Sequence, residues 1–252
     1  MTSKPPATDA PRVQLLFGGY GGMGSATARR LAEKGFRCVV AGLNRERGTA
    51  LADEIAGAFV ECDVTDPDAV HAALEAAAQE GRLVGVANFA GSILLKPAHL
   101  TSPEEFGEVL AVNLTSAFLV VRAAAPALRS AGGGAVLPIS SAAARAGLPN
   151  HEAIAAAKGG VSALARSAAA TYAPWGVRVN ALAPGLVETP MSEQITGSEK
   201  GRERSLAMHA LERLGRPADV AAAAAWLLDP DEASWVTGQT VSVDGGLAHL
   251  KG

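Results

Sequence analysis

The chain has 252 residues, of which 48% are hydrophobic and 4% aromatic, and its formal net charge is -3. This slightly acidic balance gives no electrostatic footprint for nucleic acid or an anionic membrane surface, and no run of about 18 apolar residues predicts a bilayer-spanning helix. We therefore expect a soluble chain, long enough to bury a full core as one α/β domain.

The N-terminal segment differs from the rest of the chain. Residues 1–12 lack the apolar stretch of a signal peptide and have the composition of a disordered tail, so the folded domain is expected to span residues 13–252. Cys38 and Cys62 fall in or beside predicted buried strands, where a thiol is usually a small hydrophobe. With no disulfide framework, the sequence favours the reducing cytoplasm.

Short aliphatic or β-branched runs alternate with longer alanine-rich helical patterns after this tail. The predicted strands are 13–17, 37–41, 58–60, 83–87, 135–140, 177–182 and 239–243. Apolar strands separated by helices predict right-handed βαβ units, and hence a doubly wound parallel sheet covered on both faces. Two of the helices, 103–130 and 150–174, would leave apolar surface exposed on a monomer, which indicates an assembly interface.

A glycine-rich stretch, "FGGYGGMG" at 17–24, joins the first predicted strand to a helix. Gly18, Gly22 and Gly24 have the spacing GxxxGxG, which permits a tight turn and lets a pyrophosphate approach the helix N-terminus. A glycine-rich loop by itself is a weak signal, and the alternative interpretation is a plain glycine turn.

This glycine spacing and the motifs after it resemble those of the short-chain dehydrogenase/reductase family. The later motifs are "CDV" (62–64), "NFAG" (88–91), "VNL" (112–114), "ISS" (139–141), "PGLVET" (184–189) and "WVTGQTVSVDGG" (235–246). The resemblance covers about residues 12 to 248. It implies a single Rossmann-type domain whose seven-stranded parallel sheet has the order 3-2-1-4-5-6-7, a bound NAD or NADP, and a homodimer or homotetramer.

The resemblance also implies which residues hold the cofactor, and it implies no metal. These residues are Gly18, Tyr20, Gly22, Met23, Gly24, Asn44, Arg45, Asp63, Val64, Asn88, Ala90, Gly91, Lys158, Pro184, Gly185, Val187 and Thr189. Among them, Asp63 corresponds to the acidic residue that contacts the adenine in the family.

The end of the second strand favours NADP over NAD. An acidic side chain there would bind the ribose 2′-OH and repel a 2′-phosphate, but the position is occupied by Gly42. Asn44 and Arg45 follow at a distance suitable for a phosphate. The alternative is that Arg45 lies on the solvent face of the next helix, where Glu46 would weaken its positive potential.

The catalytic residues implied by the resemblance are incomplete. Ser141 and Lys158 are 17 residues apart, which is the family's usual spacing, and Asn113 matches its helix asparagine. The family's proton-transferring tyrosine falls at Ile154, which cannot donate a proton. The chain has only two tyrosines, Tyr20 and Tyr172, and neither is placed to substitute.

His151 is the proton donor that we expect instead. His151, Ile154 and Lys158 are spaced i, i+3, i+7, so they would project from one face of a helix. An imidazole exchanges protons near neutral pH, although a helix N-terminus disfavours its charged form. The alternative is an ordinary polar residue in the first helical turn that bonds to nearby backbone.

Two other functions remain open at this stage. Divergent enoyl reductases of the superfamily carry their tyrosine seven residues before the lysine. His151 has the same spacing from Lys158, so reduction of an activated double bond is an alternative function. A cofactor-binding protein with little redox activity is the other. The intact cofactor motifs fit both an enzyme and such a protein.

A long polar segment, residues 188–217, exceeds the length of an ordinary connection, so it is either a functional lid or a partly disordered loop. Apolar residues among its charges, namely Met191, Ile195, Leu206 and Met208, favour an amphipathic lid over a ligand. Candidate pocket residues are Ile93, Leu94, Ala143, Leu148, Leu186 and Met191, for each of which the alternative is ordinary packing. They indicate a hydrophobic or mixed small-molecule substrate.

Overall fold

The computed structural model describes residues 10–250, and within them strands and helices alternate. The strands are β1 (Arg12–Phe17), β2 (Arg37–Gly42), β3 (Ala58–Glu61), β4 (Arg82–Asn88), β5 (Gly134–Pro138), β6 (Val177–Val179), β7 (Ala181–Pro184) and β8 (Thr240–Val243). The helices are α1 (Gly22–Glu33), α2 (Arg45–Glu54), α3 (Pro67–Gln79), α4 (Pro103–Leu110), α5 (Ser116–Ser130), α6 (Glu152–Tyr172), α7 (Glu193–Thr196), α8 (Glu199–Ala207) and α9 (Pro217–Leu228). Of the predicted tail, residues 1–9 lie outside the described residues.

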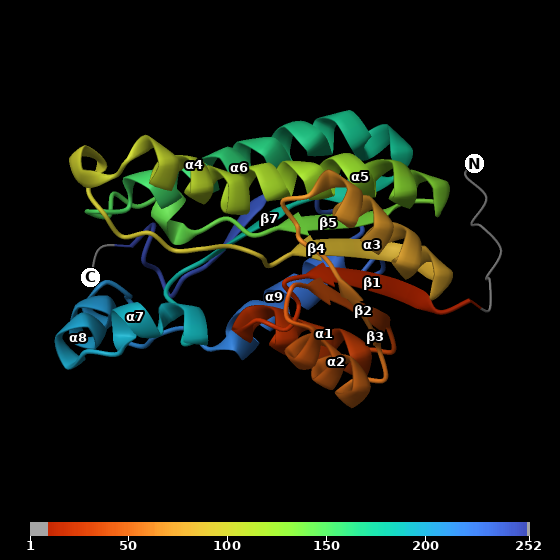
Figure 1. Ribbon diagram of the computed structural model, residues 1–252, viewed down its shortest axis with the longest axis horizontal. Helices are drawn as coiled ribbons and strands as arrows, with labels where there is room; N and C mark the ends of the chain where they lie inside the picture. The colour runs from red at the N-terminus through yellow and green to blue at the C-terminus, as the bar shows by residue number, and fades with distance from the viewer. Residues whose placement is uncertain (1–9, 251–252) are drawn as a thin grey trace.

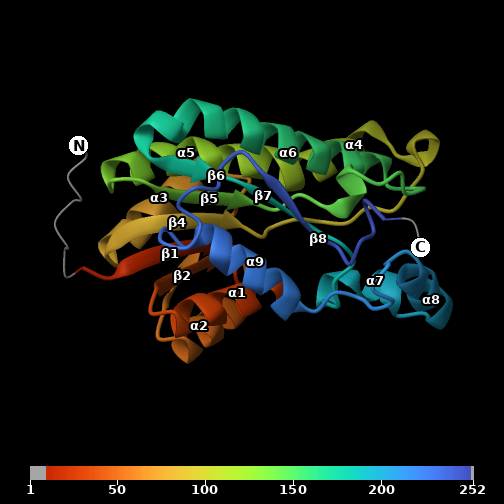
Figure 2. The ribbon, with the colours of Figure 1, turned by 180° about the vertical axis from the view of Figure 1, so that it is seen from behind.

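A parallel sheet with helices on both faces forms the centre of the molecule, as predicted. Six strands pair in the order β3-β2-β1-β4-β5-β6, and every pairing is parallel. Helices α3, α5 and α6 cover one face, and α1, α2 and α9 cover the other (Figures 1 and 2). The order changes direction between β1 and β4, so loops at the carboxyl ends of these strands diverge and leave a crevice.

The last part of the sheet differs from the predicted single seven-stranded sheet. The predicted strand 177–182 divides at Asn180 into β6, which pairs with β5, and β7, which pairs with β8. At the division, the Asn180 side chain donates to Val236 O (2.8 Å) and accepts from Gln239 N (3.0 Å), while its backbone N–H still donates to Val136 O of β5 (3.1 Å). A single bridge between Ile139 and Leu182 keeps β7 beside the extension of β5.

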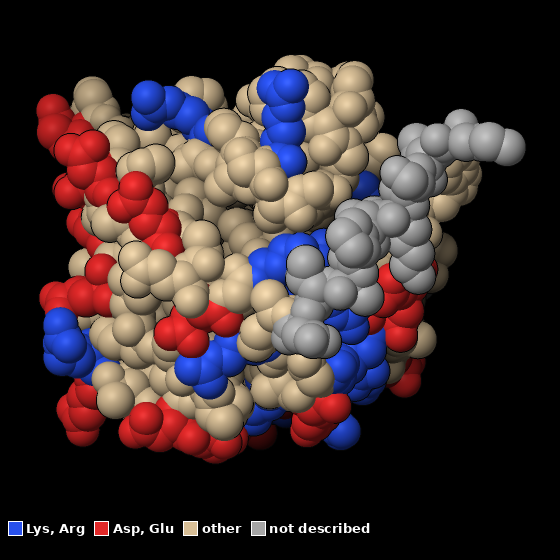
Figure 3. Space-filling model, turned by 90° about the vertical axis from the view of Figure 1, so that its right-hand side faces the viewer, with Lys and Arg blue, Asp and Glu red and all other residues tan. Residues whose placement is uncertain are grey.

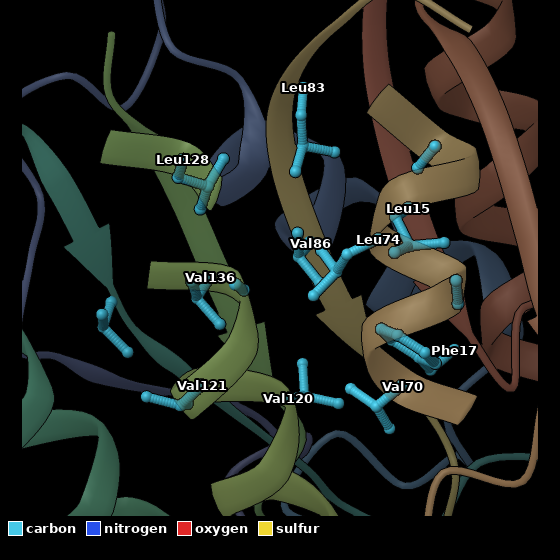
Figure 4. Close-up of a cluster of buried hydrophobic side chains, with 14 of the residues drawn as sticks. Leu15, Phe17, Val70, Leu74, Leu83, Val86, Val120, Val121, Leu128 and Val136 are labelled. Atoms are coloured by element: carbon cyan, nitrogen blue, oxygen red, sulfur yellow. The ribbon is translucent and has the colours of Figure 1, made fainter. Parts of the chain in front are cut away.

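Two hydrophobic layers, one on each side of the sheet, hold the helices in place. On the α3 and α5 side, Figure 4 shows Leu15, Phe17 and Val86 of the sheet against side chains such as Leu74 and Val120. On the other side, residues such as Leu16 and Val40 contact Leu31 of α1 and Leu228 of α9. Because successive strand residues face opposite layers, strands buried on both faces appear as continuous apolar runs in the sequence.

The helical run Pro103–Ser130 corrects one sequence prediction. It consists of α4, a π-helical turn at Ala111–Thr115 and α5, and by length and composition it is apolar enough to cross a membrane. The sequence pattern predicts no bilayer-spanning helix in this chain. Half of its most apolar window is buried, and α5 packs on β4, β5 and α3, so the run is a core helix of the domain.

Charged side chains of both signs share the molecular surface. On the face in Figure 3, Lys and Arg side chains are interspersed with Asp and Glu side chains, and acidic groups gather along one edge. The ion pairs Arg37–Glu80, at the surface, and Lys34–Asp229, whose aspartate is buried, join separate elements.

Candidate active site

The glycine-rich loop after β1 makes a turn that side chains would block. Gly18 has a φ of +65°, and a Cβ there would lie 2.7 Å from Ala90 N. A Cβ on Gly22 would lie 2.6 Å from Thr189 Cγ2. The loop leads directly into α1, whose N-cap residue is Gly21.

The N-terminus of α1 has the properties of an anion site. Gly21 has no side chain to cap the helix, and within the described chain the N–H groups of Gly22, Met23 and Gly24 donate to no other group. Such free donors together with the helix dipole favour a phosphate. The loop borders a cleft of about 450 Å³ that is lined from several elements by Gly18, Tyr20, Gly22, Met23, Gly24, Arg47, Asp63, Val64, Ala90, Gly91 and Thr189 among others.

The Tyr20 ring lies beside Gly42 at the end of β2. A Cβ on Gly42 would lie 2.5 Å from the Tyr20 ring, so the ring occupies the space of a residue-42 side chain. The Tyr20 hydroxyl accepts from Asn44 N at 3.0 Å, which leaves its own hydrogen free to donate. Asn44 itself caps α2 by accepting from Arg47 N, and its side chain is therefore already used.

The structure corrects the placement of Arg45. Its guanidinium bonds to the carboxylate of Glu61 at 2.7 Å, and it does not line the cleft. The cation that lines the cleft is Arg47, which lies over the Tyr20 ring at 5.5 Å and donates to Tyr20 O. Sequence reasoning missed Arg47, because residues two apart on a helix point about 200° apart and the helix start was not known.

The other predicted cofactor residues fall into three groups, which line the cleft, lie buried beside it, or line a second cavity. Asp63 lines the cleft, and hydrogen bonds from the Thr65 hydroxyl and N–H lower the pKa of its carboxyl group. Asn88 and Val187 are buried beside the cleft without lining it, and Asn88 accepts from Ala90 N to fix that loop. Pro184 and Gly185 line a second cavity instead.

This second cavity, of about 300 Å³, is bounded by the loops after β4, β5 and β7, by the start of α6 and by α8. Its lining is Ile93, Leu95, Ser141, Ala142, Ala143, Leu148, Pro149, Asn150, His151, Ile154, Pro184, Gly185, Leu186, Ile195, Gly201, Arg204, Ser205, Met208 and Leu247. Most of these side chains are apolar. The predicted pocket residues Leu94 and Met191 are absent from the lining, and Met191 lines the cofactor cleft.

Ser141 and His151 are brought together in this cavity. Ser141 follows β5, and its hydroxyl accepts from Ala143 N at 3.1 Å, so its hydrogen remains free to donate. His151 is the N-cap residue of α6, and its Nδ1 lies 2.8 Å from Pro149 O. Because a carbonyl only accepts, Nδ1 carries a hydrogen and Nε2 is the nitrogen left to exchange a proton.

Ile154 forms part of the apolar wall of the same cavity. Its side chain is 6% exposed and belongs to a cluster with Val109, Ala153 and Ala157. In the family that the sequence resembles, this position carries the hydroxyl of a tyrosine. In this chain, the side chain of Ile154 makes hydrophobic contacts instead. The described part of the chain offers no tyrosine in the cavity lining.

Lys158 is buried and lines neither the cleft nor the cavity, but its ammonium lies close to Gly91 of the cleft lining. Its ammonium donates to Ile139 O at 2.8 Å, and burial lowers its pKa to about 8. A Cβ on Gly91 would be 3.6 Å from Lys158 Nζ and 2.9 Å from Asn113 Oδ1, so both residues lie under this loop. The Asn113 side chain bonds to Ser92 and to Val109 O and thereby fixes the loop after β4.

The segment 188–217 folds into short helices against the cavity. Ile195 of α7 and Arg204, Ser205 and Met208 at the end of α8 contribute to the lining, whereas Leu206 does not. His209 ties α8 to the loop after β7, because it accepts from Leu186 N (3.2 Å) and donates to Ser205 O (2.7 Å). Within residues 10–250, no group of three His, Cys, Asp or Glu side chains could hold a metal ion.

Comparison with known proteins relates this site to oxidoreductases. A family model described as enoyl-(acyl carrier protein) reductase matches residues 19–248. The chain is 38% identical over 248 residues to cis-4-hydroxycyclohexanecarboxylate dehydrogenase of Sinomonas cyclohexanicum, covering 94% of this chain and 96% of the relative. It is 39% identical over 196 residues to an inactive 2-(S)-hydroxypropyl-CoM dehydrogenase of Xanthobacter autotrophicus, covering 76% and 85%.

Solved structures that are similar to this fold are likewise named as a dehydrogenase/reductase and a ketoreductase. A short-chain type dehydrogenase/reductase from Mycobacterium ulcerans superposes with a TM-score of 0.90 at 32% identity, covering 96% of this chain and 91% of that one. A variant of actinorhodin polyketide ketoreductase solved with NADPH has a TM-score of 0.89 at 27% identity, covering 95% and 98%.

Proposed function

Because the chain belongs to the short-chain dehydrogenase/reductase family, and is thus a nicotinamide-dependent oxidoreductase of alcohols and carbonyls, we propose that it prefers NADP and uses His151 for proton transfer. The observation that carries this proposal is the shared cavity of Ser141 and His151, in which Ile154 stands where the family has its tyrosine.

The cleft fits a dinucleotide by its shape and its donors. The free N–H groups of Gly22, Met23 and Gly24 would hold the pyrophosphate, and the close approach of Gly22 to Thr189 leaves no room for a side chain there. The buried Lys158 has two further N–H donors for the nicotinamide ribose, because only one is used by Ile139 O. The bound cofactor supplies the carbon that accepts or donates hydride.

The preference for NADP rests on Tyr20 and Arg47. The usual acidic group at position 42 is absent, the Tyr20 hydroxyl has a free hydrogen, and Arg47 lines the same part of the cleft. A 2′-phosphate carries only acceptors and negative charge, so it suits both side chains. A 2′-hydroxyl gains no comparable interaction from a guanidinium.

The proton transfer follows from the hydrogen bond of His151. In the oxidation direction, Nε2 of His151 would accept the proton of the alcohol O–H, and the nicotinamide of a bound cofactor would supply the acceptor for the hydride of the carbinol carbon. The carbonyl of Pro149, held by Nδ1–H, orients the ring and stabilises the imidazolium. Because His151 is partly exposed, the proton then passes to solvent. Reduction of a ketone runs through the same atoms in reverse.

The substrate that we propose is a secondary alcohol on a saturated ring, or its ketone. The cavity walls near Ser141 are Ile154, Leu148, Leu186 and Met208, which suit a compact apolar body. The Sinomonas relative, at 38% identity over most of both chains, is named for an alcohol on a cyclohexane ring. Because Ile154 takes the place of an aromatic ring, more of the cavity is available to such a body.

A second candidate is a cofactor-binding protein with little redox activity. The observations that favour it are the hydrophobic residue at position 154 and the relative from Xanthobacter autotrophicus that is named inactive. The cofactor cleft fits both candidates equally, so binding of NADPH cannot separate them.

The experiment that tests the proposal is turnover with a substrate panel. Purified protein is incubated with NADPH or NADH and with cyclic ketones such as cyclohexanone, and oxidation of the cofactor is followed by absorbance. We expect turnover with at least one cyclic ketone and a higher kcat/KM with NADPH than with NADH. NADPH binding without turnover of any ketone or cyclic alcohol would support the second candidate.

We further propose that the protein works in the cytoplasm. Cys38 and Cys62 are both buried free thiols, and burial raises the pKa of Cys38 to about 12 and that of Cys62 to about 11. Thiols held protonated in this way form no disulfide and suit a reducing compartment.

A further inference from the structure

We propose that the substrate carries an anionic group, such as a carboxylate, and that Arg204 binds it; this inference rests on the proposed function. Arg204 is the only side chain with a fixed formal charge among the residues that the structure gives as lining the cavity of Ser141. The other polar side chains of that lining are Ser141, Asn150, His151 and Ser205. An apolar wall with one arginine at its edge suits a molecule with an apolar body and one negative charge.

The charge of Arg204 is unused in the described part of the chain. Its neighbour Arg202 pairs with Glu188 at 2.7 Å, and Arg213 pairs with Asp219 at 2.6 Å, but no ion pair or hydrogen bond is found for the Arg204 side chain. A cation in the last turn of a helix is favoured by the helix dipole, which explains an arginine on α8. The dipole does not explain why this guanidinium borders the cavity.

The position of Arg204 is set by the rest of the site. Ser205, the next residue, is buried and its carbonyl accepts from His209, which also bonds to Leu186 of the loop after β7. The end of α8 is therefore fixed relative to the loop that borders Ser141. From this fixed backbone position, the planar guanidinium of Arg204 can bind a carboxylate through two parallel hydrogen bonds.

Arg204 would act on substrate choice more than on the chemical step. A carboxylate bound by Arg204 has the same charge in alcohol and ketone, so the contact lowers the free energy of substrate and transition state together. Arg204 is exposed, and the attraction is therefore weakened by dissolved salt. A charged hydrogen bond of this kind is worth about 10- to 100-fold in affinity.

The test compares an acid with its neutral ester within each protein. The kcat/KM values for 4-oxocyclohexanecarboxylate and for its methyl ester are measured with wild type, Arg204→Gln and Arg202→Gln. Arg202 is on the same helix and carries the same charge, but it pairs with Glu188 and does not line the cavity. Taking the ratio within each protein cancels any general effect of a substitution on folding or turnover.

We expect wild type and Arg202→Gln to prefer the acid by about 10- to 100-fold, and Arg204→Gln to lose most of this preference. Raising the ionic strength from about 0.02 M to about 0.5 M should reduce the preference in wild type. An acid-to-ester ratio that is unchanged in Arg204→Gln would overturn the proposal.

A binding measurement separates this proposal from the proposed function. Cyclohexanecarboxylate and cyclohexanecarboxamide, which contain no reacting alcohol or ketone, are titrated into the complex with NADPH and followed by calorimetry. Tighter binding of the carboxylate, lost in Arg204→Gln, would support the arginine site even if no ketone were turned over. Equal binding of the two ligands to wild type would contradict the arginine site even in an active enzyme.

Discussion

Lys158 stands apart from the other residues of the site because its charge is buried. Burial lowers the pKa of its ammonium from 10.5 to about 8, so the folded state holds this proton less tightly than the unfolded chain does. Below about pH 8 both states are protonated and the full cost of burying the charge remains. Between about pH 8 and 10.5 the unfolded state binds more protons, so this contribution to the free energy of unfolding rises with pH.

We predict that Lys158→Met makes the cofactor-free protein more stable at pH 7. The gain should be up to about 3 kcal/mol, the equivalent of the pKa shift, less the cost of leaving Ile139 O without its donor. The difference between variant and wild type, measured by urea unfolding, should shrink toward pH 10. Comparing the two proteins cancels the opposite trend from Cys38 and Cys62, whose raised pKa values lower stability above about pH 9. If the difference in free energy of unfolding between Lys158→Met and wild type stayed constant with pH, a buried charge on Lys158 would be contradicted.

Arg47 and Arg45 offer a matched pair on one helix. We predict that Arg47→Ala raises the Kd for NADPH by about 10-fold and changes the Kd for NADH by less than about 2-fold, because Arg47 lines the cleft and, under the proposed NADP preference, its guanidinium would bind the 2′-phosphate. Arg45→Ala removes the same charge but only breaks the pair with Glu61, and it should leave both values nearly unchanged. Fluorescence titration measures all four constants. Equal weakening by both substitutions would indicate a general electrostatic effect.

At the scale of elements, the predicted strands were confirmed because apolar runs between alanine-rich helices are typical of a buried parallel sheet. The division at Asn180 was not predicted, since it depends on hydrogen bonds with residues 236 and 239, which are far away in the sequence. The glycine loop could be found from its spacing. The direction of Arg47 and the capping role of Asn44 depend on where α2 begins, and so does the hydrogen bond from Asn44 N to the Tyr20 hydroxyl. The sequence pattern left this boundary open.

The predicted lid includes α8, which His209 connects to the loop after β7. We predict that His209→Ala speeds hydrogen exchange in residues 199–208 by about 10-fold or more, because two buried hydrogen bonds are lost together. Exchange in β1 and β4 should not change. His71→Ala, which removes an exposed histidine from α3, serves as the control. In wild type, exchange in this segment should slow when NADPH and substrate are bound, and equal rates with and without ligands would rule out a lid.

At the scale of the whole molecule, the helical face of α4 and α5 exposes large aromatic side chains. Phe106 is 39% exposed and Phe118 49% exposed, on helices that the sequence already indicated as an interface. We predict a homodimer or homotetramer in light scattering, and a smaller species for Phe118→Glu because a charge at an apolar interface is costly. A wild-type mass of 25.5 kDa at micromolar concentration would contradict an assembly.

The most direct test of the central claim, proton transfer by His151, is the pH profile of turnover for His151→Phe. We expect kcat with the preferred cyclic ketone to fall by about 100-fold or more, because general acid catalysis is lost. The Kd for NADPH should stay within about 2-fold of wild type, since His151 lines the substrate cavity and not the cofactor cleft. Full activity of His151→Phe from about pH 5 to pH 9, where imidazole exchanges its proton, would contradict the claim and assign the proton to water or Ser141.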